Sequence, residues 1–279
     1  MTSAFCPGHL TCFFRPVRTA DIMTTGSEGV GIRLSLGSVV HVDERTDDRI
    51  CVTMDGRSSD ARVTVRTAEL LAGGRGFDIT VENQLPVSQG FGMSAAGAIA
   101  TGLCICRIIG KKECEAYRAA HTADIREMGG MGDVSALAAK GPISIRLKAG
   151  LPPDGDVTSE SCKRKLTLIV ADGRMETKNV LSNEEAIGRI SSAGDIAMRS
   201  YLFDRRLFRA SRYFSVSAGL ESEEVRRMLS DLGGNAAMCM LGNSIFTTHS
   251  EDVAKDMLGH DVETYSCIPV SDAASIRKA

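Results

Sequence analysis

The segment QGFGMSAAGAIA, residues 89–100, holds three glycines, four alanines and one serine in twelve positions. Alanine favours a helix and glycine opposes one, so the segment predicts a loop that runs directly into a helix. A helix N-terminus presents unpaired backbone N–H groups and a partial positive charge, and a glycine-rich loop before it exposes them. This combination is typical of a phosphate site, although a tight turn before a closely packed core helix would have a similar composition.

Three phosphate-binding motifs compete for this segment. The Walker pattern fails because no Lys-Ser or Lys-Thr pair follows the glycines. Gly90, Gly92 and Ala95 nearly match the Rossmann fingerprint, but that motif follows a strand at once. Here Gln84, Pro86, Ser88 and Gln89 intervene, and the preceding strands are expected to be antiparallel. The remaining pattern, Pro-x-x-x-Gly-φ-Gly-x-Ser-Ala-Ala, is filled at every fixed position over residues 86–96.

Four stretches of the chain resemble one known family. LPVSQGFGMSAAGA, residues 85–98, resembles the phosphate-binding motif of the GHMP kinases, the superfamily of galactokinase and of homoserine, mevalonate and phosphomevalonate kinases. Three others resemble the archaeal pantoate kinases within that superfamily: FCPGHLTCFF with GSEGVGIRLSLG (5–14 and 26–37), HTADIREMGGMGDVSALAAKGPISIRLKAG (121–150) and LGGNAAMCMLGNSIF (232–246). The resemblance therefore extends over most of the chain.

Hydrophobic periodicity predicts a β-rich opening, two helices and a mixed second half. The expected strands span 4–14, 29–43, 49–54, 61–67, 77–83, 142–150, 165–172, 236–242 and 244–249. The expected helices span 94–109, 112–128, parts of 183–213, and 222–232.

A polar segment containing proline and glycine, near residues 150–163, predicts a domain boundary. We expect an N-terminal GHMP kinase domain over 1–155, with the ATP phosphate loop and the catalytic acids, and a C-terminal GHMP kinase domain over 156–279. The resemblance implies an α+β protein of the GHMP kinase fold. In that fold a ribosomal protein S5 domain 2-like domain precedes a ferredoxin-like α+β domain.

The resemblance also assigns ligands to the glycine-rich loop. Many members of the superfamily have two serines there, whereas Met93 stands at the first position and only Ser94 remains. A backbone N–H at position 93 can still reach a phosphate, and the Ser94 hydroxyl can cap the helix or contact a metal. The residues expected to bind ATP are Pro86, Gly90, Phe91, Gly92, Met93, Ser94, Ala95, Ala96 and Gly97.

Phosphoryl transfer needs carboxylates close to the phosphates. Tyr117, His121 and Asp124 have the spacing i, i+4 and i+7, which places them on one helix face, and Asp133 follows after a GGMG turn. By resemblance, Ser94, Asp124 and Asp133 are catalytic, with Ser94 and Asp124 holding Mg²⁺ and Asp133 acting as the base. The family usually has a longer glutamate at position 124, so a water could bridge Asp124 to the metal. Asp124 could instead be a solvated surface acid, and Asp133 could cap a helix over 134–140.

The acceptor site is also assigned by resemblance. Arg146 occupies the position of the carboxylate-binding arginine, and Ser27, His121 and Thr177 match the other pantoate contacts. Arg146 could otherwise be an exposed strand residue, and His121 a structural histidine. His9 stands where many relatives have a basic residue, and its role is open at this point.

These assignments imply an ATP- and Mg²⁺-dependent kinase that phosphorylates the primary hydroxyl of pantoate to 4-phosphopantoate in coenzyme A biosynthesis. The same chemistry on homoserine, mevalonate or shikimate is one alternative. A catalytically silent ligand-binding protein on the same scaffold is another.

Composition restricts the partners. The 33 basic and 35 acidic residues nearly cancel, which argues against nucleic acid as a partner. The longest weakly polar run, residues 95–109, is too short to cross a membrane. Nine cysteines without a secretory signal indicate a reducing compartment, so we expect a cytoplasmic protein, and the resemblance implies a homodimer.

Overall fold

The computed structural model describes residues 1–173, 180 and 182–277. Its larger sheet has eight strands in the order β12-β1-β2-β5-β3-β4, with β6 paired to β2 and β7 paired to β6. These strands are β1 (Thr2–Val17), β2 (Gly26–Glu44), β3 (Ile50–Met54), β4 (Arg57–Ser58), β5 (Phe77–Asn83), β6 (Ile143–Lys148), β7 (Asp156–Glu160) and β12 (Ser275–Arg277).

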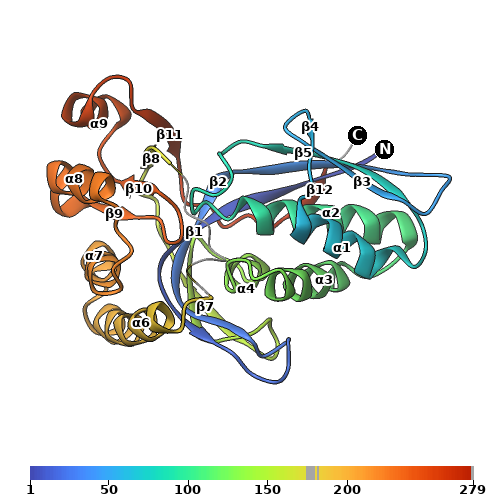
Figure 1. The fold of residues 1–279 in the computed structure, drawn as a ribbon, viewed down its shortest axis with the longest axis horizontal. Helices are drawn as coiled ribbons and strands as arrows, with labels where there is room; N and C mark the ends of the chain where they lie inside the picture. The colour runs from blue at the N-terminus through green and yellow to red at the C-terminus, as the bar shows by residue number, and fades with distance from the viewer. Residues whose placement is uncertain (174–179, 181, 278–279) are drawn as a thin grey trace.

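Four helices belong to this sheet: α1 (Arg62–Ala72), α2 (Met93–Ile109), α3 (Glu113–Arg126) and α4 (Asp133–Ala138). Figure 1 shows α1, α2 and α3 together on one face of the sheet. Helix α2 lies at the centre, packed against β1 and β2 on one side and against α1 and α3 on the other. It is apolar nearly all round, as a fully buried helix must be.

The second sheet has the order β11-β8-β10-β9, formed by β8 (Leu166–Val170), β9 (Ala236–Met238), β10 (Ser244–Thr247) and β11 (Glu263–Cys267). Helices α6 (Glu184–Asp204), α7 (Leu207–Ser217), α8 (Glu223–Leu232) and α9 (Glu251–Leu258) lie along one side of the molecule (Figure 1), and the 3₁₀ turn η1 (Gly233–Asn235) follows α8. Asn183, Ser222 and Ser250 cap α6, α8 and α9 by accepting a backbone N–H three residues further on.

Strand β1 contacts both parts of the molecule. It pairs with β2 in the larger sheet, and α6 and α7 pack against it from the other side. The Ser211 hydroxyl of α7 donates to the carbonyl oxygen of Cys12 at 2.7 Å. The pairing register of β1 shifts between Pro7 and His9 and again between Thr11 and Phe13. Because such bulges re-aim side chains, these two shifts set the directions of His9 and Thr11.

The predicted α+β class, most strands and both N-terminal helices are confirmed, but the strand expected at 61–67 is wrong. This segment opens α1, because Val63, Thr67 and Leu71 are buried at a spacing of four that continues beyond the β-branched stretch. Helix α1 links β3 to β5, which are parallel, so the expectation of purely antiparallel preceding strands is also wrong. The helical stretch 183–213 is interrupted at Arg205, which has a φ of 57°.

The domain boundary at residues 155 and 156 stays a prediction. Strand β7 lies in the segment expected to be a linker, where it pairs with β6. Strand β12, near the other end of the chain, returns to pair with β1. The larger sheet therefore includes residues from both sides of the predicted boundary.

Candidate active site

The glycine-rich loop lies tightly against its neighbours. Gly90 and Gly92 have φ values of 77° and 68°, which side chains disfavour. A Cβ at Gly90 would lie 2.9 Å from the carbonyl oxygen of Cys239, and one at Gly92 would lie 2.6 Å from that of His9. Glycine is therefore required at both positions, as much by the close backbone approach as by the backbone angle.

Helix α2 begins at Met93, and no side chain caps its N-terminus at Gly92. The predicted capping role of Ser94 is therefore wrong, because Ser94 is the second residue inside the helix. Its side chain is exposed and lines a cavity. Among the described residues, the first N–H groups of α2 therefore have no side-chain cap, and they begin beside the cavity.

The second part of the molecule holds this loop in place through Gln89. The Gln89 side-chain oxygen accepts the N–H of Asn243 at 3.1 Å, and its amide nitrogen donates to the carbonyl of Gly173 at 2.9 Å. Ser244 donates its hydroxyl to the Gln89 carbonyl. A Cβ at Gly242 would lie 2.0 Å from the Gln89 backbone, so this contact also requires glycine.

A cavity of about 510 Å³ opens beside the loop. Its walls come from β1, from the turn before α1 and the first residues of that helix, from the glycine-rich loop, from the segment between α3 and α4, and from the turn before β10. The lining residues include Thr11, Met54, Ser59, Asp60, Arg62, Ser88, Gly92, Ser94, Glu127, Gly130, Asp133, Met240 and Leu241.

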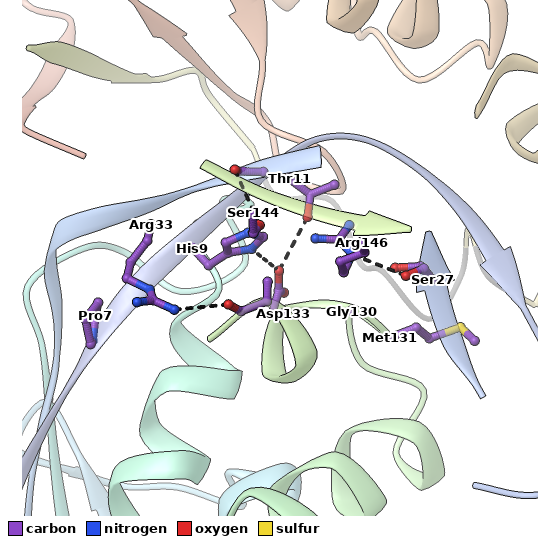
Figure 2. Close-up of polar contacts among 12 residues, drawn as sticks. Pro7, His9, Thr11, Ser27, Arg33, Gly130, Met131, Asp133, Ser144 and Arg146 are labelled. Carbon is purple, nitrogen blue, oxygen red and sulfur yellow. Dashed lines mark hydrogen bonds and ion pairs between the residues drawn. The ribbon is translucent and has the colours of Figure 1, made fainter. Parts of the chain in front are cut away.

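Asp133, the first residue of α4, faces this cavity. Its Oδ1 lies 2.7 Å from Nδ1 of His9 and accepts a longer hydrogen bond of 3.5 Å from the Thr11 hydroxyl (Figure 2). Its Oδ2 is directed toward Gly130, where a Cβ would lie 2.5 Å from it. The alternative role as a helix cap is wrong, since Gly132 occupies the cap position and no side-chain cap is present.

Asp124 is buried near the end of α3, with 2% of its surface exposed, so the alternative of a solvated surface acid is wrong. Its two oxygens accept the N–H groups of Gly130 at 3.2 Å and Met131 at 3.0 Å. Burial, reinforced by the charge of Asp133, raises the pKa of Asp124 to about 7. Asp124 thus shapes the turn before Asp133, and it forms no ion pair with a cationic side chain among the described residues.

Arg146 of β6 is 1% exposed, so it is not the surface strand residue that the sequence allowed as an alternative. Its Nε donates to the carbonyl of Ser27 at 3.3 Å, and Figure 2 shows it between Ser27 and Asp133. Within the described part of the chain, neither terminal nitrogen of Arg146 has a hydrogen-bond partner, and the Ser27 hydroxyl has none either. A Cβ at Gly132 would lie 2.3 Å from that hydroxyl.

The chain was compared with known proteins. The family model for the N-terminal domain of GHMP kinases matches residues 62–141. Over 269 residues the chain is 31% identical to the pantoate kinase of Thermococcus kodakarensis, and the match covers 90% of this chain and 89% of that enzyme. The chain belongs to the pantoate kinase family of GHMP kinases.

Two further similarities agree with this family. The pantoate kinase of Methanospirillum hungatei is 28% identical over 256 residues, which cover 88% of this chain and 86% of that one. A solved structure described as a phosphotransferase related to the CoA biosynthesis pathway superposes with a TM-score of 0.87 at 27% identity, covering 99% and 98% of the two chains. The GHMP kinase fold is thus confirmed along the chain, and the protein is an enzyme that uses ATP to phosphorylate an alcohol.

The predicted site residues divide into three groups. Of the predicted ATP-binding residues, Gly90, Phe91, Gly92, Met93 and Ser94 line the cavity together with Asp133, whereas Pro86, Ala95, Ala96 and Gly97 are not among its lining residues. Asp124, Arg146 and Ser27 lie in the buried layer next to Asp133. His121 instead lies 2.9 Å from the Ile22 carbonyl oxygen through Nε2, a structural contact, and burial lowers its pKa. Thr177 lies outside the described residues.

Sequence reasoning missed three contributors to the site. It left the role of His9 open, although one imidazole in an otherwise apolar strand was a signal. It did not select Ser144, whose hydroxyl lies 2.9 Å from Nε2 of His9. It also missed Gln89 as the anchor of the loop.

Proposed function

We propose that this enzyme transfers the γ-phosphate of ATP to the primary hydroxyl of pantoate, giving 4-phosphopantoate for coenzyme A biosynthesis. The observation that carries the proposal is the buried guanidinium of Arg146, whose terminal nitrogens have no protein partner among the described residues. A buried charge without a partner destabilises the protein. An anionic ligand that pairs with this guanidinium would therefore remove an energetic cost that the unliganded protein carries. The T. kodakarensis relative, named a pantoate kinase, supports a small hydroxy acid as that ligand.

Arginine suits a carboxylate because its planar fork donates two parallel hydrogen bonds. The unpartnered Ser27 hydroxyl beside it offers one more polar contact. Gly132 lies against both side chains and directly precedes Asp133. An acid held by Arg146 would therefore present its hydroxyl group close to the carboxylate of Asp133. We assign pantoate binding to Ser27 and Arg146, and keep His121 and Thr177 as further proposed contacts.

Asp133 is the proposed base. Its Oδ1 is occupied by His9 and Thr11, which leaves Oδ2 to receive the proton of the acceptor hydroxyl. The hydroxyl oxygen forms the new bond to the γ-phosphorus while the bond from that phosphorus to the β–γ bridging oxygen breaks. ADP leaves with that electron pair. Asp133 therefore contributes orientation and proton acceptance, while the larger part of catalysis in phosphoryl transfer comes from positioning and charge stabilisation.

The nucleotide phosphates are proposed to bind the loop at residues 90–97, where the uncapped start of α2 supplies N–H groups. The available donors also suit Mg²⁺, which favours oxygen ligands and retains several waters. We assign it to the Ser94 hydroxyl and, through water, to Asp124, a buried carboxyl group whose pKa is raised by burial and by the charge of Asp133. When bound, the ion would neutralise charge on the phosphates.

The quaternary state and location remain proposals. We propose a homodimer in the cytoplasm, with the two GHMP kinase domains divided near residue 155. Within the described ranges, none of the helices combines the length and apolar character needed to span a bilayer.

The proposal is tested by measuring ADP release with pantoate, homoserine, mevalonate and shikimate as separate acceptors. We expect turnover with pantoate to exceed that with the other three. Comparable turnover with another of these alcohols would reassign the acceptor. Absence of phosphate transfer to all four would contradict the proposed function.

A further inference from the structure

A row of three side chains lies behind the proposed base. His9 of β1 contacts Asp133 through Nδ1 at 2.7 Å and Ser144 of β6 through Nε2 at 2.9 Å (Figure 2). The His9 side chain has no exposed surface. Its ring also lies against Gly31, where a Cβ would come within 2.3 Å of Nε2. The imidazole is thus fixed between its two partners with little space to rotate.

The hydrogen-bond donors and acceptors of Asp133, His9 and Ser144 are compatible with one arrangement of protons. An ionised carboxylate only accepts, so Nδ1 must carry the proton directed at Asp133. A neutral imidazole then has a bare Nε2, which accepts the hydroxyl proton of Ser144. The other acceptor within reach of that hydroxyl, the Gly31 carbonyl oxygen, is more distant at 3.4 Å.

The surroundings favour the neutral imidazole. Arg33 and Arg146 are the nearest cations, and both disfavour a further positive charge on His9. Burial acts in the same direction and is the largest influence, so the pKa of His9 lies below its ordinary value despite Asp133. Asp124 on α3 is close enough to Asp133 for the two carboxyl groups to interact electrostatically, and the pKa of Asp124 is itself raised to about 7.

We propose that His9 and Ser144 are positioning residues for phosphoryl transfer: Ser144 donates to the bare Nε2 of His9, and His9, protonated at Nδ1 toward Asp133, holds that carboxylate with Oδ2 free for the substrate hydroxyl. This inference rests on the proposed function for its kinetic consequences. Its structural content, the protonation state of one histidine, does not depend on the substrate. Catalytic bases are commonly oriented by a further group; here the proposed base is the carboxylate of Asp133 and His9 orients it.

The first test is nitrogen-15 NMR of the histidine-labelled full-length enzyme, with His9→Asn used to assign the signal. We expect a neutral ring protonated at Nδ1 between pH 6 and 8 in the wild type and in Ser144→Ala, with the Nε2 signal shifted in the variant because that nitrogen loses its hydroxyl donor. A cationic ring at pH 7, or an Nε2–H form in the wild type, would overturn the proposal.

The second test is kinetic. Because a well-placed base contributes roughly 10²- to 10⁴-fold, losing its orientation in His9→Ala should lower kcat about 10- to 100-fold, with KM values within about 3-fold. His9→Asn, whose amide can still donate to Asp133, should recover much of that loss. Ser144→Ala should lower kcat in the wild type but add nothing in the His9→Asn background.

Rescue by the conservative variant separates positioning from a general structural effect. If His9 positions Asp133, kcat should fall in His9→Ala and recover in His9→Asn, with KM values little changed in both variants. His249→Ala is the matched control, because that histidine contacts the Leu232 carbonyl outside the proposed site. An active wild type with unchanged kcat in His9→Ala would contradict the inference. A wild type inactive on all four alcohols would contradict the proposed function instead, while the NMR test would still decide the protonation state.

Discussion

Arg146 donates one hydrogen bond, from Nε to the backbone carbonyl of Ser27 at 3.3 Å, and its other nitrogens face no acceptor in the described chain. The strand that carries Arg146 also pairs with the strand that carries Ser27: Arg146 lies opposite Gly29 in the β2–β6 register. The sheet therefore fixes this guanidinium before any ligand arrives. Such preorganisation favours binding because little side-chain entropy remains to be lost.

Replacing Arg146 should weaken binding of the acceptor and leave binding of the nucleotide unchanged. In Arg146→Met we expect kcat/KM for pantoate to fall about 100-fold, the effect of losing two charge-assisted hydrogen bonds, while KM for ATP changes little. Arg146→Lys should recover only part, because an ammonium lacks the two-pronged geometry. Lys148→Met, at an exposed position on the same strand, is the control. Equal changes in KM for pantoate and for ATP would remove Arg146 from the acceptor site.

Asp124 should make stability depend on pH. Its pKa is raised from about 3.9 in an unfolded chain to about 7 in the folded protein. The folded state therefore binds more protons between these values, and its stabilisation is lost as the pH rises from about 4 to 7. The loss is on the order of 4 kcal/mol for this group. Denaturant unfolding at pH 4 and pH 8 measures most of this loss.

In Asp124→Asn that part of the pH dependence should disappear, whatever the variant's overall stability. The amide can accept only one of the two N–H groups that Asp124 now accepts, so some general destabilisation is also expected. A variant with the same pH slope as the wild type would show that Asp124 is ionised throughout this range.

Gly92 should be intolerant of any side chain. A Cβ there meets the His9 carbonyl oxygen at 2.6 Å and must also adopt a φ of 68°. Gly92→Ala should therefore raise KM for ATP at least about 10-fold by displacing the phosphate loop. Gly110→Ala is the matched control, because Gly110 ends the same helix with a φ of 73° and open space around it. It should lose only about 1 kcal/mol of stability and keep its KM. Similar KM values in the two variants would contradict the role of the loop.

The contacts of Gln89 with Gly173 and Asn243 should hold the glycine-rich loop in place against the second part of the molecule. Gln89→Ala removes the contacts to Gly173 and Asn243, and we expect KM for ATP to rise several-fold, since each lost hydrogen bond costs about 1 kcal/mol. Gln84→Ala, which loses only a contact to the Gly37 N–H within the larger sheet, is the control. If both variants keep the wild-type KM for ATP, Gln89 does not set the position of the loop.

Local sequence drew attention to the glycine-rich loop, whereas the proposed base and its support depend on contacts between residues far apart in the chain. Glycines at 90 and 92 are demanded by backbone angles and close approach, which a single sequence records. His9 and Asp133 are 124 residues apart, and their contact depends on bulges in β1 that no local pattern reveals. Helix α1 was mistaken for a strand because Val63 and Val65 alternate, although burial recurs at helical spacing from Val63 to Leu71.

The central claim is tested most directly by phosphorus-31 NMR of the product formed from ATP and pantoate, with wild-type enzyme and with Asp133→Asn. The account predicts a phosphomonoester on the primary hydroxyl with the wild type, and none above background with the variant, which should still bind ATP. Absence of that phosphomonoester with the wild type, or its formation at an undiminished rate by Asp133→Asn, would contradict the account.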